Sequence, residues 1–153
     1  MKFFKTLTKD QNLWNIIYAL FFLIFVAVLS RTLFLKLGYF PTSISLPDFL
    51  LIVLATFRLI RLFVYDKITF FLRDLFVDVE RGPLKTFSEL LACPWCFGVW
   101  CSALILFLYY YTPLSWYFIL LLAVGGLASF LQLLSNAIGW NAEHSKKRVL
   151  EER

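Results

Sequence analysis

Charged residues are scarce in this sequence: they make up 16% of its 153 residues, whereas hydrophobic residues make up 61%. A soluble domain of this size carries about 25% charged residues. The apolar residues also lie in long runs separated by short charged stretches. This composition excludes an ordinary soluble domain and predicts an all-α membrane protein built as a helical bundle.

The sequence also has few of the residues that catalysis commonly needs. Its single histidine, His144, lies in a polar tail, so a Ser-His-Asp arrangement has no suitable member. No glycine-rich phosphate-binding loop is present. The net charge of +5 does not predict nucleic-acid binding, because the basic residues lie at the ends of apolar runs and form no stripe. An enzyme is therefore the least supported class.

Four apolar runs predict four transmembrane helices. They are Leu13 to Ser30, Phe49 to Tyr65, Cys93 to Tyr111 and Leu114 to about Ile138. Each approaches the ~20 residues that cross a bilayer as a helix. The first lacks a small-residue cleavage site and is expected to remain as an anchor. Residues 1–47 then form the anchor and an external loop, 48–140 the membrane core, and 141–153 a cytoplasmic polar tail.

The short connection between the third and fourth runs predicts an antiparallel hairpin, since only Thr112-Pro113 separates them. In the fourth run, Gly125, Gly126 and Ser129 predict a face that approaches another helix closely. Eleven of the 15 basic residues fall on one side of the four spans, and only Arg31 and Lys36 fall on the other. Both termini are therefore expected in the cytoplasm.

The stretch 67–80 predicts an amphipathic helix on the inner membrane surface. Its apolar residues recur three and four positions apart, with charged residues opposite. The apolar positions are Ile68, Phe71, Leu72, Leu75, Phe76 and Val79. Asp66 is expected to cap this helix at a hinge, and Gly82-Pro83 is expected to end it.

Two arginines within the second run, Arg58 and Arg61, are three positions apart and share a helix face. No Asp or Glu lies inside the predicted spans, so an ion pair has no evident partner there. The favoured ligand is lipid phosphate, with Arg73 as a third basic candidate. Neutral acceptors in the same half of the membrane are expected to help; these are Asn15, Gln132, Ser135 and Asn136. A bound anion or an acidic partner chain are the alternatives.

Three cysteines complete the candidate sites: Cys93 and Cys96 in a Cys-Pro-Trp-Cys motif, and Cys101. The favoured interpretation is structural, with Pro94 starting a helix and Gly98 allowing close packing. A redox dithiol or a metal site is the alternative. No cofactor is expected; a zinc site needs about four ligands, and only Cys101 and His144 are available besides the pair.

Several of these motifs together resemble a family of small membrane proteins, domain-of-unknown-function family 1360. The matching segments are Thr56 to Leu62, Asp66 to Ile68, Arg73, Glu89 to Leu91 and Cys93 to Trp100. The resemblance spans roughly Asp48 to Ser129, so the first helix looks like an addition. It implies a bacterial or phage protein of the inner membrane, and that Arg58, Arg61, Asp66, Arg73, Cys93 and Cys96 belong to one arrangement. It implies no established activity.

The favoured function is a non-enzymatic membrane scaffold or interaction protein. Its expected partners are anionic lipid headgroups and either another copy of the chain or another membrane protein, with no nucleic acid. One alternative is a thiol-redox or metal-binding protein that uses Cys93 and Cys96. The other is a small pore or lysis-type protein.

Overall fold

The computed structural model describes residues 11–39, 41, 43–76 and 82–151, which are helical and contain no strand. The side chains of Arg73 and of residues 144–151 lie outside this description. The elements in chain order are α2 (Gln11–Leu37), α3 (Leu46–Val64), a 3₁₀ turn η1 (Lys67–Thr69), α4 (Phe70–Asp74), α5 (Pro83–Ala92), α6 (Pro94–Tyr111) and α7 (Ser115–Glu151).

Three of these helices are long and apolar enough to cross a membrane. They are Gln11–Leu37, Pro94–Tyr111 and Ser115–Glu143. Helix α3 is not among them; its 19 residues include Asp48, Arg58 and Arg61. The all-helical class is therefore confirmed, with three candidate spans among the described residues.

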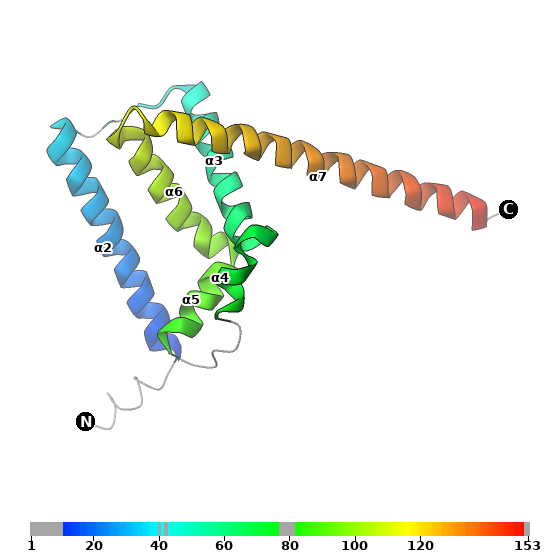
Figure 1. Ribbon diagram of the computed structural model, residues 1–153, viewed down its shortest axis with the longest axis horizontal. Coiled ribbons are helices and arrows are strands. Elements are labelled where there is room, and N and C mark those ends of the chain that lie inside the picture. The colour runs from blue at the N-terminus through cyan, green and yellow to red at the C-terminus, as the bar shows by residue number, and fades with distance from the viewer. Residues whose placement is uncertain (1–10, 40, 42, 77–81, 152–153) are drawn as a thin grey trace.

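Successive helices α2, α3 and α6 alternate in direction (Figure 1). The link from α2 to α3 and the turn from α6 to α7 lie at one end of the molecule. The short helices α4 and α5 lie toward the other end, with α4 next to the end of α3 and α5 beside the start of α2. Both candidate sites described below are near this second end of α3 and α6.

The core lies where α3, α6 and α7 meet. Its buried residues are Ile52, Ala55 and Leu59 from α3, Cys101 and Ile105 from α6, and Ile119, Leu122 and Ala123 from α7. A Cβ on Gly126 would lie 2.3 Å from the carbonyl oxygen of Leu54, so the backbones of α3 and α7 are in close contact. The predicted close-packing face of the fourth helix is thus confirmed. On α6, a Cβ at Gly98 would lie 3.1 Å from Ile60 Cδ1.

The predicted antiparallel hairpin is wrong in its packing. Helix α7 follows α6 after a short turn, but it leaves α6 at a wide angle and packs chiefly on α3 (Figure 1). The small residues of α7 let it approach α3 closely, and this contact decides its direction. The helix also continues past Ile138 to Glu151, so it includes most of the predicted polar tail.

The surface helix predicted over 67–80 is helical only in its first part, from Lys67 to Asp74. A 3₁₀ turn and the five-residue α4 end at Asp74, and the predicted positions from 77 to 80 lie outside the described residues. Gly82 begins the next helix instead of ending the previous one: it is the N-cap of α5, with φ at 97°, and Pro83 is the first helical residue. A positive φ is strained for any residue with a Cβ, which explains glycine here.

Candidate functional site

Arg58 lies at the centre of a polar cluster that joins α3 to α7. Its Nη1 atom is 3.0 Å from Asp66 Oδ2 and donates a hydrogen bond of 3.0 Å to Ser129 Oγ. The Ser129 hydroxyl in turn donates to the Gly125 carbonyl oxygen at 2.8 Å. The expectation that Arg58 has no carboxylate partner is therefore wrong, because Asp66 lies just beyond the predicted span and reaches back to it.

The tight end of α3 places Asp66 near Arg58. The Arg61 carbonyl oxygen accepts hydrogen bonds from the backbone N–H groups of Tyr65 and Asp66, at 2.9 and 3.0 Å. The buried Thr69 hydroxyl donates to carbonyl oxygens of this turn, including that of Leu62. Asp66 does occupy the N-cap position of η1, but its side chain makes no cap hydrogen bond. The carboxylate pairs with Arg58, so the predicted capping role is wrong.

A hollow of about 410 Å³ opens beside this ion pair, between α3 and α7. Its polar lining residues are Arg58, Arg61, Asp66, Ser129, Gln132 and Asn136. We call it the arginine notch. Two guanidinium groups and one carboxylate leave it with one net positive charge, as expected of an anion site.

Arg61 supplies the positive charge that Asp66 does not balance. The Nε atom of Arg61 is buried and has no hydrogen-bond partner among the residues that the structure describes. Its guanidinium carbon lies 5.5 Å from the ring centre of Tyr65 and 6.0 Å from that of Phe57, within the range of cation–π attraction. Aromatic rings stabilise the cation but accept no strong hydrogen bond, so the guanidinium retains capacity to donate to an anion.

The neutral acceptors predicted for the arginines are only partly brought together. Gln132 and Asn136 line the notch and bond to each other at 3.1 Å, whereas Ser135 is not among its lining residues. Asn15 lies elsewhere and accepts a hydrogen bond from Thr86. Ser129 is the residue that the sequence argument missed as a ligand of Arg58; its position four residues after Gly125, on the face toward α3, was the available signal. Arg73, the third basic candidate, belongs to α4, and its side chain lies outside the described residues.

A second candidate site lies at the start of α6. Cys93 is the N-cap residue, Pro94 is the first helical residue, and the Cys93 Sγ atom accepts a hydrogen bond of 3.3 Å from the Cys96 backbone N–H. The neighbouring Cys96 thiol, and then this N–H group, lower the pKa of the Cys93 thiol below its ordinary value. Cys93 is partly exposed and Cys96 is exposed.

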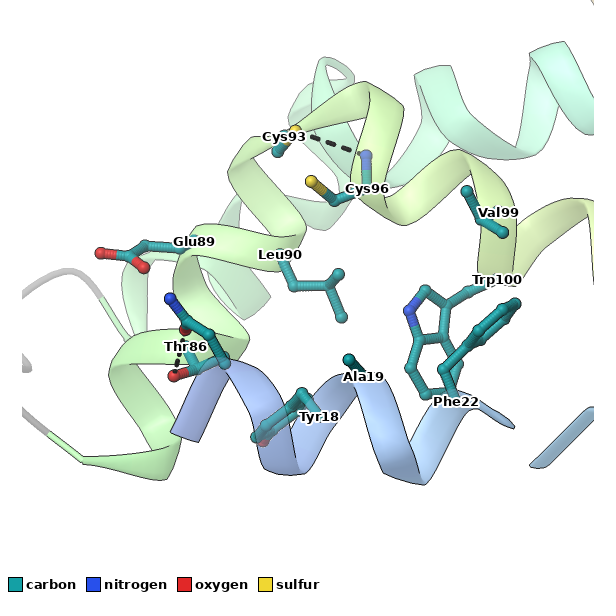
Figure 2. Close-up of a pocket in the computed structure, with 11 residues that line it drawn as sticks. Tyr18, Ala19, Phe22, Thr86, Glu89, Leu90, Cys93, Cys96, Val99 and Trp100 are labelled. Carbon is teal, nitrogen blue, oxygen red and sulfur yellow. Dashed lines mark hydrogen bonds between the residues drawn. The ribbon is translucent and has the colours of Figure 1, made fainter. Parts of the chain in front are cut away.

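The two thiols line a pocket of about 500 Å³ between α2, α5 and α6, which we call the thiol pocket (Figure 2). It is lined by Asn15, Tyr18, Ala19, Phe22, Thr86, Glu89, Leu90, Cys93, Cys96, Val99 and Trp100. The Trp100 ring packs among three α2 rings, those of Phe21, Phe22 and Phe25, at 4.8 to 5.8 Å between centres. Apolar rings therefore form the pocket wall on the side away from α5.

Cys101 does not join the pair, because it is buried in the core among α3, α6 and α7. Within the part of the chain that the structure describes, no three His, Cys, Asp or Glu side chains gather at one point where a metal ion would fit. The described geometry thus brings together two of the three cysteines only.

Hydrogen bonds close the other end of the thiol pocket and connect α2 to α5. Gln11 Nε2 donates to the Thr86 hydroxyl at 2.6 Å, and that hydroxyl donates to Asn15 Oδ1 at 3.1 Å. The Gly82 backbone N–H donates to Gln11 Oε1 at 3.3 Å. We call this group the α2–α5 clamp. Sequence reasoning did not predict it, because its partners are more than 70 positions apart.

Arg58, Arg61 and Asp66 of the arginine notch, and Cys93 and Cys96 of the thiol pocket, lie within the region that matches a known family. The family described as protein of unknown function (DUF1360) matches residues 51–84 and 80–135. This chain belongs to that family. The resemblance recognised from the arginine and cysteine motifs is therefore confirmed.

Two curated relatives from Bacillus subtilis (strain 168) are similar to this chain over 102 residues. The UPF0713 protein YngL is 35% identical, over 58% of this chain and 78% of the relative. The sporulation protein YjcA is 36% identical, over 55% of this chain and 86% of the relative. No solved structure matches.

Proposed function

We propose that this chain is an integral membrane protein that binds the phosphate of anionic lipid headgroups in the arginine notch and acts through interactions with other molecules. In this proposal α3 is a fourth span, and Arg58 and Arg61 lie in its inner half. The N-terminus, α4, α5 and the C-terminus face the cytoplasm of a bacterium. The protein is a scaffold or interaction protein and performs no catalysis at the notch.

The observation that carries the proposal is the uncompensated charge of Arg61. Asp66 neutralises Arg58 at 3.0 Å, whereas Arg61 has aromatic neighbours and a buried Nε without an acceptor. Guanidinium groups bind phosphate through paired hydrogen bonds, and arginines near a helix end reach toward headgroups. Gln132 and Asn136 add side-chain amide groups that can donate to phosphate oxygens.

The test is lipid retention by the full-length protein. We would reconstitute wild type, Arg61→Gln and Lys67→Gln into phosphatidylglycerol–phosphatidylcholine vesicles, extract them in mild detergent, and count bound lipids by native mass spectrometry. Lys67 is an exposed residue of η1 outside the notch, so its variant loses the same charge elsewhere. Arg61→Gln should retain about tenfold less phosphatidylglycerol, since a charged hydrogen bond contributes about 1.5–3 kcal/mol.

Three results would contradict the proposal: equal retention by wild type and Arg61→Gln, an equal loss in Lys67→Gln, or displacement of the lipid by millimolar inorganic phosphate. The last would identify free phosphate as the ligand. The same vesicles loaded with a dye test the pore alternative, because wild-type protein that releases the dye acts as a pore and not as a scaffold.

The name of one relative points to a biological setting for the test. YjcA is called a sporulation protein, and we propose the membranes of the developing spore as the first place to measure a phenotype. In a spore-forming host, deletion of the gene should reduce the yield of heat-resistant spores more than vegetative growth. The deletion strain is then complemented with the wild-type gene or with Arg61→Gln. The yield of heat-resistant spores from the two strains tests whether the notch is needed.

A further inference from the structure

We propose that Cys93 and Cys96 form a dithiol that exchanges with a disulfide bond presented at the thiol pocket by another molecule. This activity goes beyond the proposed lipid binding and uses different residues. The proposal rests on three observations: the placement of both thiols at the start of α6, their accessibility, and the apolar pocket that they line.

The helix start places the two sulfur atoms for sequential reaction. Cys93 precedes the helix and Cys96 lies in its first turn, on the same side of the pocket (Figure 2). The Cys96 N–H group points at Cys93 Sγ, at 3.3 Å, and would stabilise a thiolate there. The lowered pKa of Cys93 agrees with this role, since a larger thiolate fraction exists near neutral pH.

The exposure of Cys93 and Cys96 argues against a purely structural role for the motif. A cysteine that only packs is buried, as Cys101 is, with 3% of its surface exposed. Cys96 is exposed, and Trp95 between the two cysteines is 86% exposed. The pair therefore lies at the surface, next to an aromatic side chain that is largely exposed.

The pocket indicates what kind of molecule presents the disulfide. Its walls include Phe22, Leu90, Val99 and Trp100, so an apolar group next to the disulfide would fit the hollow of about 500 Å³. The α2–α5 clamp holds one end of the pocket closed. A disulfide with apolar flanks, delivered from the membrane surface, matches this shape better than a small charged disulfide.

The exchange takes place in two steps. The Cys93 thiolate attacks one sulfur of the incoming disulfide, forming a mixed disulfide and releasing the other sulfur as a thiolate, which takes a proton from water. The Cys96 thiol then loses its proton to water and attacks Cys93 Sγ, forming the Cys93–Cys96 disulfide and releasing the second thiolate. Two electrons pass from this chain to the substrate, and a cellular dithiol returns the pair to its reduced form.

The experiment uses the full-length protein in detergent with two probes, dipentyl disulfide, which is apolar, and glutathione disulfide, which is charged. After acid quenching, remaining thiols are alkylated and mapped by mass spectrometry. Wild type and Cys101→Ser should both form the Cys93–Cys96 disulfide, faster with the apolar probe. Cys96→Ser should stop at a mixed disulfide on Cys93, and Cys93→Ser should react about tenfold more slowly. Faster oxidation by glutathione disulfide would still support exchange and would point to a water-soluble substrate.

Several results would overturn the proposal. In alkylation at pH 7 without a disulfide, Cys93 should react about tenfold faster than Cys96, and equal rates would remove the basis for a nucleophilic Cys93. Absence of the intramolecular disulfide with both probes would reject exchange. Stoichiometric zinc in wild type that disappears in Cys93→Ser/Cys96→Ser and protects the thiols would assign the pair to metal binding. None of these results depends on the arginine notch.

Discussion

Arg58 shows how a charge becomes acceptable within an apolar helix. Its guanidinium contacts Asp66 and Ser129, which come from the turn after α3 and from α7. Both partners of the ion pair have about a quarter of their side-chain surface exposed, at 27% and 25%. A pair of this kind depends on having both members, because either one alone leaves a partly desolvated charge.

A double-mutant cycle tests this coupling. Arg58→Leu and Asp66→Asn should each lower the thermal stability of the detergent-solubilised protein, and the double variant should lose less than the sum. We expect a coupling energy of about 1 kcal/mol for a direct contact. The measurement is thermal unfolding of all four proteins. Strictly additive effects would show that Arg58 and Asp66 do not interact in the folded protein.

Insertion and assembly should respond in opposite directions to Arg58→Leu. The isolated α3 segment should insert at least as well as wild type, since a central arginine costs about 2.5–3.5 kcal/mol on insertion. The full-length variant should lose its native oligomer profile, because α7 loses the Ser129 contact. Arg61→Lys provides a milder comparison, since lysine near the interface still reaches the headgroups. Glycosylation-reporter insertion and native gel profiles measure the two effects.

Gly126 is a residue at which a single methyl group should separate two helices. Gly126→Ala should destabilise the protein by about 1–3 kcal/mol, because its Cβ would lie 2.3 Å from the Leu54 carbonyl oxygen. Gly139→Ala is the matched control: the glycine is in the same helix, and a Cβ there meets nothing within 4 Å. The control should be neutral or slightly stabilising. Equal unfolding temperatures for the two variants would contradict the close contact of α3 and α7.

Helix α2 has no buried residue, and the α2–α5 clamp holds it against the rest of the molecule. Helix α2 packs on α6 through the rings around Trp100 and on α5 through Gln11 and Asn15. The family match begins at residue 51, so the clamp connects the segment before the matched region to that region. Its hydrogen bonds dock the start of α2, whereas at the other end of the helix the Lys36 ammonium group donates to the Tyr111 carbonyl oxygen.

Thr86→Val tests the clamp without changing the side-chain shape. Loss of the hydroxyl leaves Gln11 and Asn15 without their shared partner, which costs about 1 kcal/mol because Gln11 is half-buried and Asn15 is exposed. Hydrogen exchange at the start of α2 and in α5 should become faster. Thr32→Val is the control, since that hydroxyl bonds only within its own helix, to the Val28 carbonyl oxygen. Unchanged exchange in Thr86→Val would show that the clamp does not hold α2.

The sequence predicted those elements whose signal is local. Apolar runs predicted α2, α6 and the first part of α7, and the glycines of α7 predicted its packing face, because these depend on residues close in the chain. The partnership of Arg58 with Asp66 was missed since it depends on how sharply the chain turns after α3. Helix α5 was missed because Gly82-Pro83 can end one helix or start the next, and only the N-cap geometry distinguishes the two.

The exposed apolar surface of the molecule requires an apolar solvent. Helix α2 combines high hydropathy, 2.4 over its best window, with no fully buried residue, so much of its apolar surface faces outward. In water this surface would drive aggregation, whereas in a bilayer it is solvated by lipid tails. The placement of α4 and α5 toward the end where α2 begins is compatible with one membrane face for the start of α2 and these two short helices (Figure 1).

Reporter fusions test the proposed orientation. Fusions at the N-terminus, after Ala92 and at the C-terminus should read cytoplasmic, and one after Lys36 should read external, because basic residues concentrate on the inner side. A phosphatase reporter active only outside and a fluorescent reporter active only inside give paired readings. An external signal at the C-terminus would reject four spans and would fit α3 lying outside the membrane.

The length of α7 gives the molecule a lever. Its 37 residues extend about 56 Å at 1.5 Å per residue, and it contacts α3 most closely at Gly126. The 25 residues from that contact to Glu151 span about 38 Å, and the last 15 of them lie beyond Asn136, the last residue of α7 that lines the arginine notch. A tilt of about 10° at this fulcrum would displace the far end by roughly 7 Å, more than one helical turn. Small rearrangements around Arg58 and Ser129 would therefore be magnified into much larger movements of the far end of α7.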